Sequence, residues 1–287
     1  MSIEPVLRQA LQSSSRLRLE NGWTLELIQE NAFEVRTESC SYFVKWIAED
    51  DEYGQNEIRI NQEILADNEL PAPRLVEVIK TSAARIACWE WLNGSDLRQN
   101  ERQHLARAFE RLGQFHKKQR HHGSVYSPIT RQPFLSAKEL LDDDWNFLTT
   151  ACDIPQYARR SHLAPLETGY PTIIHGDMHP GNLRLTANGL YFVDWGFAQP
   201  SLNLFDLDYI HAIALDPNPD WWIIRPDEAA SVLPSYYQSC GMDGANQSQL
   251  QRSIMIYTEL HSLYNATQKN NQEGAAHCRI HLKILCD

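Results

Sequence analysis

The chain has 287 residues, of which 43% are hydrophobic, and a formal net charge of −11 at pH 7. At roughly 150 residues per domain, this length is enough for about two domains or lobes, each able to bury a core. The acidic balance argues against non-specific nucleic-acid binding and against attachment to an anionic membrane surface. No segment approaches the roughly 20 consecutive apolar residues of a membrane-spanning helix.

The six cysteines are irregularly spaced and form no C-x-x-C pair. This spacing argues against a zinc ribbon or a disulfide framework and fits a reducing compartment. Near the N-terminus, Arg8, Arg16 and Arg18 interrupt the apolar core that a signal peptide would need. The sequence therefore predicts a cytoplasmic protein, and it does not specify an oligomeric state.

The N-terminal part is predicted to form a small antiparallel sheet. The expected strands cover residues 16–20, 23–29, 32–38 and 41–47. The first two flank Asn21-Gly22, a pair that favours a two-residue hairpin turn. The strand over 32–38 alternates apolar and polar residues, as a half-buried strand does, and the strand over 41–47 carries Lys45.

A helix is predicted next, over residues 55–67, and Pro71 and Pro73 end it. Two more strands are expected over 74–80 and 85–91. They lead into Asn93-Gly94-Ser95, a signal for a turn or a linker. We therefore place a boundary between two lobes at this linker.

The N-terminal lobe is expected to cover residues 1–92 and the C-terminal lobe residues 93–287, because the pattern turns helical beyond the linker. Helical spacing or capping signals indicate helices over residues 105–116, 136–145, 227–237 and 250–263. Ser136 and Glu139 have the S-x-x-E form of a capping box. Residues 173–193 are expected to form short strands and a loop.

Three polar side chains follow short apolar runs in the stretch from Ile173 to Gly196. Asp177 is followed five residues later by Asn182 and, twelve residues after that, by Asp194. Polar groups at the ends of buried strands are costly unless they have partners or a function. Phosphoryl transfer requires one carboxylate to accept a hydroxyl proton and two oxygen ligands for Mg²⁺. The pattern therefore favours magnesium-dependent phosphoryl transfer.

The same stretch, with H-G-D-M-H-P-G-N followed by F-V-D-W-G, resembles the aminoglycoside phosphotransferase and choline kinase family. Further segments resemble that family's motifs in the same order: a lysine strand at 42–45, an L-P-x-P segment at 70–73, a hinge at 89–94, a helix end at 112–116 and a Y-D-L-A element at 205–207. The resemblance implies an α+β, two-lobed protein-kinase-like fold. In it, the small antiparallel-sheet N-lobe binds the nucleotide, and the larger, mainly helical C-lobe carries catalysis and substrate binding.

The resemblance also implies roles for the three polar residues. Asp177 would orient the acceptor hydroxyl and take its proton. Asn182 and Asp194 would coordinate the Mg²⁺ that bridges the ATP phosphates. Because phosphoryl transfer depends mainly on positioning and on neutralising the charge of the moving group, these roles are physically sufficient.

The nucleotide contacts are implied in the same way. Lys45 would contact the α and β phosphates and pair with a helix glutamate, for which Glu57 is favoured over Glu63. The backbone of the hinge residues Glu90, Trp91 and Leu92 would hydrogen-bond the adenine. The implied enzyme is a small-molecule kinase that uses ATP, or GTP with the same hinge geometry, to phosphorylate a hydroxyl of an aminoglycoside-like compound, an amino alcohol or a related metabolite.

One segment departs from the family pattern. The family has glycine or small residues in the turn between its first two strands, over the phosphates, whereas this chain has Gln29-Glu30-Asn31. Glycine lets backbone N–H groups approach phosphate closely, and Glu30 would repel phosphate if it pointed inward. The alternative function is therefore a nucleotide-binding pseudokinase or regulatory protein with little turnover.

A third hypothesis is a metal-dependent hydrolase that uses His175, Asp177 and His179 as ligands, since H-x-D-x-H resembles a metal-binding cluster. No second histidine cluster lies at a suitable distance in the sequence. Asn182 and Asp194 would also go unexplained. This hypothesis therefore ranks well below the kinase.

The C-terminal third is rich in aromatic residues: Trp221, Trp222, Tyr236, Tyr237, Tyr257 and Tyr264. They could line a cage for a quaternary amine through cation–π contacts, but core packing is the more common role of such residues. The last 75 or so residues resemble the family only in being helical. The sequence therefore does not identify the phosphate acceptor.

Overall fold

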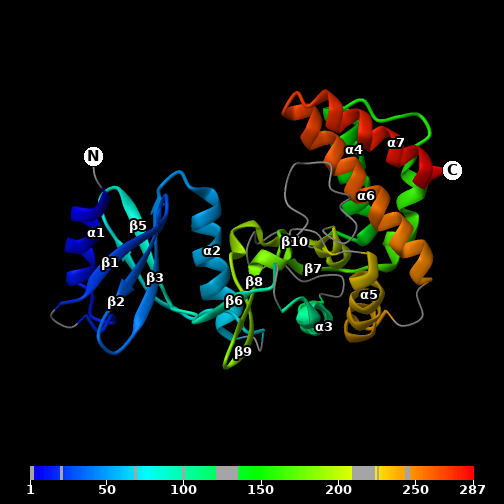
Figure 1. Cartoon of the computed structure of the whole chain (residues 1–287). Coiled ribbons are helices and arrows are strands. Elements are labelled where there is room, and N and C mark those ends of the chain that lie inside the picture. The colour runs from blue at the N-terminus through cyan, green and yellow to red at the C-terminus, as the bar shows by residue number, and fades with distance from the viewer. Residues whose placement is uncertain are drawn as a thin grey trace. The chain divides into compact units, whose positions relative to one another are not determined.

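The computed structural model describes residues 3–19, 22–67, 70–98, 101–120, 135–208, 224, 226–242 and 246–287. The chain divides into two compact units (Figure 1). Unit 1 comprises Met1–Ser95 and Arg184–Ala198, and unit 2 comprises Asp96–Leu183 and Gln199–Asp287. The lobes expected from the sequence place 184–198 in the second lobe, whereas the structure groups this segment with the first.

Unit 1 is built on an antiparallel sheet that has five strands in the described residues, in the order β1-β2-β3-β5-β4. The strands are β1 Thr24–Gln29, β2 Ala32–Arg36, β3 Ser41–Ala48, β4 Leu75–Lys80 and β5 Ala84–Glu90. β3 lies in the centre of the sheet, and its Lys45 is paired with Ala32 on one side and Ala87 on the other. The central position gives Lys45 a rigid backbone.

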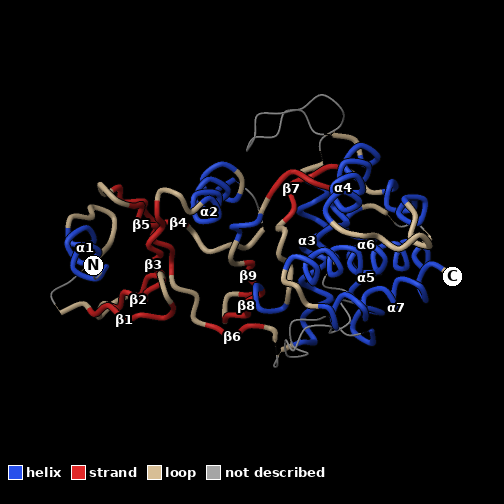
Figure 2. The backbone as a smooth tube through the Cα atoms, turned by 90° about the horizontal axis from the view of Figure 1, so that it is seen from above, coloured by secondary structure: helices blue, strands red, loops and turns tan. Residues whose placement is uncertain are grey.

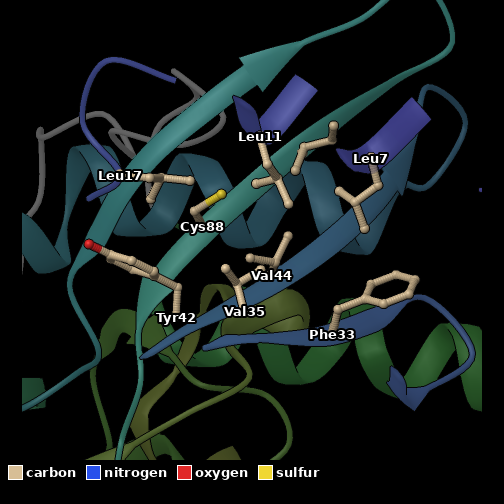
Figure 3. Packing of buried hydrophobic residues seen from close by; sticks show 9 residues of the cluster. Leu7, Leu11, Leu17, Phe33, Val35, Tyr42, Val44 and Cys88 are labelled. Carbon is tan, nitrogen blue, oxygen red and sulfur yellow. The ribbon is translucent and has the colours of Figure 1, made fainter. Parts of the chain in front are cut away.

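Helices α1, Ile3–Gln12, and α2, Glu52–Glu63, cover opposite faces of this sheet (Figure 1). Successive side chains of a strand point to opposite faces. Val44 therefore packs with Leu7 and Leu11 of α1, as Figure 3 shows, whereas Ile47 packs with Ile58 of α2. Lys45 has the same alternation as Ile47, so its side chain lies on the α2 face.

The segment before β1 differs from the prediction. The predicted strand over residues 16–20 is wrong for the described residues 16–19, which lie outside any strand. The Ser14 hydroxyl accepts hydrogen bonds from the N–H groups of Arg16 and Leu17, at 3.2 and 2.9 Å. Such a local side-chain bond competes with strand pairing. Asn21 lies outside the described residues, and α1 was not predicted.

The predicted helix over 55–67 begins earlier and ends earlier than expected. Asp51 caps α2 by accepting a hydrogen bond from the Gly54 N–H at 3.0 Å, which starts the helix at Glu52. A separate 3₁₀ segment, Leu65–Asp67, follows. The difference concerns the helix ends, and Glu57 stays in the middle of the helix.

A second sheet, in the order β6-β8-β9, contributes to unit 1. Its strands are β6 Gly94–Asp96, β8 Leu183–Thr186 and β9 Gly189–Phe192. Only glycine fits at position 94, because a Cβ there would lie 2.0 Å from the carbonyl oxygen of Leu185. β9 is anchored further by a 2.8 Å hydrogen bond from the Phe192 N–H to the Pro71 carbonyl. This anchoring fixes the start of the segment that carries Asp194.

Unit 2 is mainly helical, as expected for the C-terminal lobe (Figure 2). Its helices are α3 Leu105–Lys118, α4 Ala137–Ala151, α5 Pro226–Cys240, α6 Gln247–Gln268 and α7 Gln272–Cys286. Two short antiparallel strands, β7 Pro171–Ile174 and β10 Gln199–Leu202, lie among them. The predicted capping box begins α4, since the Ser136 hydroxyl accepts from the Glu139 N–H and the Glu139 carboxylate accepts from the Ser136 N–H.

Of the aromatic residues of the C-terminal third that the structure describes, Tyr236, Tyr237 and Tyr257 lie in the core of unit 2, whereas Tyr264 is partly exposed. Tyr236 and Tyr237 are fully buried, and Tyr257 is nearly so and stacks on Phe205 at 4.2 Å. Trp221 and Trp222 lie outside the described residues. None of the described helices combines the length and the apolar character that crossing a membrane would need.

Candidate functional site

The predicted site residues fall into two sets, one in each unit. In unit 1, Nζ of Lys45 lies 2.8 Å from Oε2 of Glu57 and 3.2 Å from Oδ1 of Asp194. The side chains of Lys45 and Glu57 are 14% and 8% exposed, whereas that of Asp194 is 53% exposed. Burial would lower the pKa of Lys45, but the carboxylates of Glu57 and Asp194 outweigh it and raise the pKa. Lys45 therefore carries a full positive charge.

The choice of Glu57 follows from the geometry of α2. Glu57 lies in the middle of the helix and faces the sheet, so its carboxylate reaches the lysine on β3. The Phe43 and Trp89 rings, at 5.7 and 6.0 Å from Nζ, border Lys45. The ion pair is therefore enclosed by apolar walls, which strengthens the electrostatic interaction.

Asp194 sits in a strained turn that α2 holds in place. Its φ and ψ are 63° and 64°, a left-handed conformation that non-glycine residues rarely adopt. The Asn56 side chain donates hydrogen bonds to the carbonyl oxygens of Gly196, at 2.9 Å, and Ala198, at 2.7 Å. The Tyr53 ring also contacts the Phe197 ring, with centroids 4.4 Å apart. Asn56 was not predicted from the sequence, because a polar residue on a helix gives no signal of such a role.

The hinge residues use part of their hydrogen-bonding capacity within unit 1. The Glu90 N–H donates to the Arg74 carbonyl at 3.0 Å, and the Trp91 N–H donates to the Ser41 carbonyl at 3.3 Å. In the described part of the chain, the Leu92 N–H has no such partner. Among the three predicted hinge residues, Leu92 therefore has the N–H group that is free to bind a ligand.

The turn without glycine joins β1 to β2 through Glu30 and Asn31. Neither residue has a positive φ, so the turn has no position that demands glycine. The Asn31 carbonyl accepts a 2.8 Å hydrogen bond from the Trp46 N–H, and Glu30 is exposed. The backbone of this turn therefore does not require glycine at Glu30 or Asn31.

In unit 2, Asp177 lies on a loop that follows β7. Gly176 has a φ of 79°, which allows the sharp turn just before Asp177. The buried carboxylate of Asp206 accepts hydrogen bonds from the N–H groups of His175 and Gly176, each at 2.7 Å. One side chain distant in sequence thus holds the two residues that precede Asp177.

The Asp206 carboxylate also joins a buried polar network. His116 Nε2 lies 3.1 Å from Asp206 Oδ2, and His116 Nδ1 lies 2.7 Å from the Tyr236 hydroxyl. Burial would raise the pKa of Asp206, but the hydrogen bond and charge of His116, with a contribution from His175, lower it overall. Asp206 is therefore held as a carboxylate, the form that accepts the loop's N–H groups.

Asn182 braces Asp177 directly. Its Nδ2 donates to the Asp177 carbonyl at 2.8 Å and to Asp177 Oδ2 at 3.1 Å. The Asp177 side chain is 22% exposed, and His179 Nε2 lies 3.6 Å from its Oδ2. Both bonds of Asn182 use the amide nitrogen, which leaves its Oδ1 as an oxygen donor. An amide oxygen of this kind is a ligand type that Mg²⁺ accepts in proteins, and in unit 1 the half-exposed Asp194 carboxylate is another.

The histidines of the H-x-D-x-H sequence are already engaged. Nδ1 of His175 accepts from the Asp177 N–H at 3.3 Å, and Nδ1 of His179 accepts from the Gly181 N–H at 2.9 Å. Across the described residues, no group of three or more histidine, cysteine or acidic side chains is placed to hold a metal ion. These contacts give His175 and His179 a structural role in shaping the loop.

A family model describes the relationship to known proteins. The model of the phosphotransferase enzyme family matches residues 27–239, which is more than half of the chain. The chain belongs to this family. The predicted family and the predicted enzyme class, a phosphotransferase, are therefore confirmed. No sequence among the curated proteins compared with the chain matches it.

Solved structures show the same fold at low sequence identity. The aminoglycoside phosphotransferase APH(4)-Ia has a TM-score of 0.63 and 15% identity, over 99% of this chain and 97% of that one. Aminoglycoside 2′-phosphotransferase-IIIa, solved with GDP, has a TM-score of 0.61 and 11% identity, over 99% and 98%. An ethanolamine kinase of Plasmodium vivax has a TM-score of 0.54 and 13% identity, over 93% and 82%. The predicted kinase-like fold is thus confirmed.

Proposed function

We propose that this phosphotransferase uses ATP and Mg²⁺ to phosphorylate a hydroxyl group of a small molecule. The observation that carries the proposal is the buried Lys45–Glu57 ion pair at 2.8 Å, which also contacts Asp194. A charged lysine fixed in this way on a central strand serves to bind phosphate. The membership in the phosphotransferase family supports the assignment.

Asp177 is proposed as the residue that orients the acceptor hydroxyl and accepts its proton. The bond from the Asn182 amide to Oδ2 fixes the carboxylate, and its partial exposure leaves it accessible to a substrate. Asn182 Oδ1 and the Asp194 carboxylate would hold Mg²⁺, which neutralises charge on the phosphates when it is bound. The Leu92 N–H would donate to the adenine.

The acceptor is proposed to carry an amino group as well as a hydroxyl. Structures similar to this one include a ternary complex of an APH(4)-Ia mutant with ADP and hygromycin B and an ethanolamine kinase. The net charge of −11 favours a cationic acceptor over an anionic one. Aminoglycoside-like compounds and amino alcohols are therefore the first acceptor classes to test. The proposed use of ATP also supports the proposal of a cytoplasmic location.

Turnover with a panel of acceptors tests this proposal. The protein would be incubated with Mg²⁺ and either ATP or GTP, together with aminoglycosides, amino alcohols, sugars and nucleosides. With the best acceptor, Asp177→Asn is expected to lower turnover by at least ~10²-fold. The matched control is Asp153→Asn, which changes an exposed acid and should leave turnover unchanged. Undiminished turnover of Asp177→Asn would refute the role of this carboxylate.

The turn without glycine motivates the second candidate, a nucleotide-binding protein with little turnover. Thermal unfolding with and without millimolar ATP and Mg²⁺, combined with the turnover assay above, distinguishes the two. A ligand at 100 times its Kd stabilises the folded state by about 2.7 kcal/mol, which raises the unfolding temperature. A clear shift without turnover on any acceptor would favour the second candidate. Turnover with any acceptor at an ordinary rate would exclude it.

A further inference from the structure

Three ionisable side chains join α6 to α7 within unit 2. Nε2 of His277 lies 2.9 Å from Nε2 of His281, one turn further along α7. Nδ1 of His281 lies 3.3 Å from Oε1 of Glu259 on α6. The phosphotransfer chemistry proposed above uses none of these three residues.

The two histidine nitrogens have the spacing of metal ligands. Residues four apart lie on one face of a helix, so both rings can reach the same point. Two nitrogens that each lie about 2.05 Å from one metal ion are about 2.9 Å apart when the nitrogen–metal–nitrogen angle is a right angle. They are about 3.3 Å apart when that angle is tetrahedral. The observed 2.9 Å matches the right angle, which is usual for Cu²⁺ and Ni²⁺.

Glu259 selects the form of His281 that binds a metal. The Glu259 carboxylate accepts a hydrogen bond from Nδ1 of His281, so the proton of the neutral ring is on Nδ1. Nε2 is then unprotonated, and its lone pair can coordinate a metal ion. A carboxylate behind a histidine is the usual outer partner of a metal ligand.

The carboxylate of Glu259 is buried and incompletely paired. Its side chain is 2% exposed, and in the described part of the chain its Oε2 lacks a hydrogen-bond partner. A buried carboxyl of this kind destabilises the fold unless it is paired. A positive ion on His281 would give it a charged partner.

We propose that His277 and His281 form a two-histidine site for a divalent late transition-metal ion, oriented by Glu259 and binding Cu²⁺ more tightly than Ni²⁺ or Zn²⁺. Glu273 lies one turn before His277 on α7 and is exposed. Among the described residues, no third histidine, cysteine or acidic side chain converges on this pair, so solvent would complete the coordination of a bound ion. The bound ion would strengthen the link between α7 and α6.

Calorimetric titration of the full chain, without any histidine tag, tests the site. CuCl₂, NiCl₂ and ZnCl₂ would each be added at pH 7.5 in the presence of glycine, which competes for weakly held ions. The expected result is one ion per chain, with Cu²⁺ the tightest. His277→Ala and His281→Ala should each weaken binding at least ~10-fold, and Glu259→Gln should weaken it about 10-fold with unchanged stoichiometry. Electron paramagnetic resonance of the Cu²⁺ form should show coupling to two nitrogens.

His104→Ala is the matched control. His104 also lies near a carboxylate, with its Nε2 3.4 Å from Oε2 of Glu101, but no second histidine is paired with it in the described residues. This variant should bind Cu²⁺ like the wild type. The proposal is overturned if wild type and His277→Ala bind equally, or if binding does not saturate at one ion. Because His277 is exposed, its variant should fold, and the readout does not depend on phosphotransfer.

Discussion

Replacing Asp206 with Asn tests whether one buried carboxylate holds the loop of Asp177. Asp206 is 1% exposed. Its Oδ2 accepts from the His175 N–H at 2.7 Å and from His116 Nε2 at 3.1 Å, and its Oδ1 accepts from the Gly176 N–H at 2.7 Å. Asparagine has the same shape, but it has a single acceptor oxygen and adds an N–H₂ group. The variant therefore removes bonds without changing volume.

The expected cost follows from these three bonds. In the better orientation, the new amide nitrogen faces the Gly176 N–H, so one bond is lost and two donors face each other. A hydrogen bond to a charged group contributes about 1.5–3 kcal/mol, and a neutral one contributes about 1 kcal/mol. Losing one charged bond and weakening two others gives a destabilisation of about 3–5 kcal/mol at neutral pH. Turnover should fall as well, because the backbone before Asp177 is no longer fixed.

The cost should depend on pH in a defined direction. The pKa of Asp206 is lowered in the folded protein, so folding favours the carboxylate. Its stabilising effect is complete above the ordinary pKa of about 3.9 and is lost as the pH falls through the lower folded value. Asparagine does not titrate. The difference in the free energy of unfolding between wild type and Asp206→Asn should therefore be largest near pH 7 and shrink on acidification below about pH 4.

Urea unfolding at pH 7, 5 and 3.5 measures this difference. The control is Asp153→Asn, an exposed position where a change of about 0.5 kcal/mol or less is expected. A loss below about 1 kcal/mol for Asp206→Asn at pH 7, or a loss that does not change with pH, would show that the network does not support the loop in the way described.

Three further variants probe other parts of the structure. Asn56→Ala removes both hydrogen bonds to the Asp194 turn. It should raise the Mg²⁺ concentration for half-maximal turnover at least ~5-fold and destabilise the fold by about 1–2 kcal/mol. A change in stability without a change in this Mg²⁺ concentration would contradict its positioning role. Leu7→Ala should cost about 2–5 kcal/mol in urea unfolding, because Leu7 is fully buried against the sheet, and a loss under 1 kcal/mol would mean that α1 is not part of the core. Gly113→Ala places a Cβ 2.0 Å from Ser239 Oγ and 2.8 Å from the Tyr236 carbonyl oxygen, so the melting temperature should drop clearly. Adding Ser239→Ala to this variant removes only the first clash and should restore only part of the melting temperature.

The order of motifs in the sequence predicted the elements that surround Lys45 and Asp177. The lysine strand, the following helix and the short strands around 173–193 all lie within a few residues of the expected places. These segments have strong local signals: a short apolar strand that carries Lys45, a pair of prolines after the helix, and short apolar runs before Asp177 and Asp194. Because several such signals agree with one fold, the prediction was robust to errors at each element's ends.

The beginning of the chain could not be predicted as well. Residues 16–19 alternate arginine and leucine, which is also the pattern of a strand, but the Ser14 hydroxyl binds the N–H groups of Arg16 and Leu17 instead. The preceding helix α1 has only Leu7 and Leu11 buried. Isolated helices of this length are marginal in water, so α1 depends on the sheet it covers, and local sequence alone carries little information about it.

The residues that support the site were harder to predict than the residues of the site. Asp177, Asn182 and Asp194 lie in a stretch whose residue types and order resemble the family's motif, whereas Asn56 and His116 matter only through contacts that folding creates. Asn56 lies 140 residues from one of its partners, and His116 lies 90 residues from Asp206. No local pattern marks a side chain whose partner is so distant. The sequence therefore predicts chemistry more readily than it predicts what holds the chemistry in place.

The two carboxylates around Lys45 differ in a way that suits binding of a phosphate. An ammonium group has three N–H donors, and Glu57 and Asp194 occupy two of them. The bond to Glu57 is shorter and buried, so breaking it would leave a charge unpaired inside the protein. The bond to Asp194 is longer and its carboxylate is half exposed, so solvent can replace it at little cost. In the proposed function, Lys45 would turn from Asp194 to a phosphate while Glu57 keeps it in place, and the same step would leave the Asp194 carboxylate available to a cation.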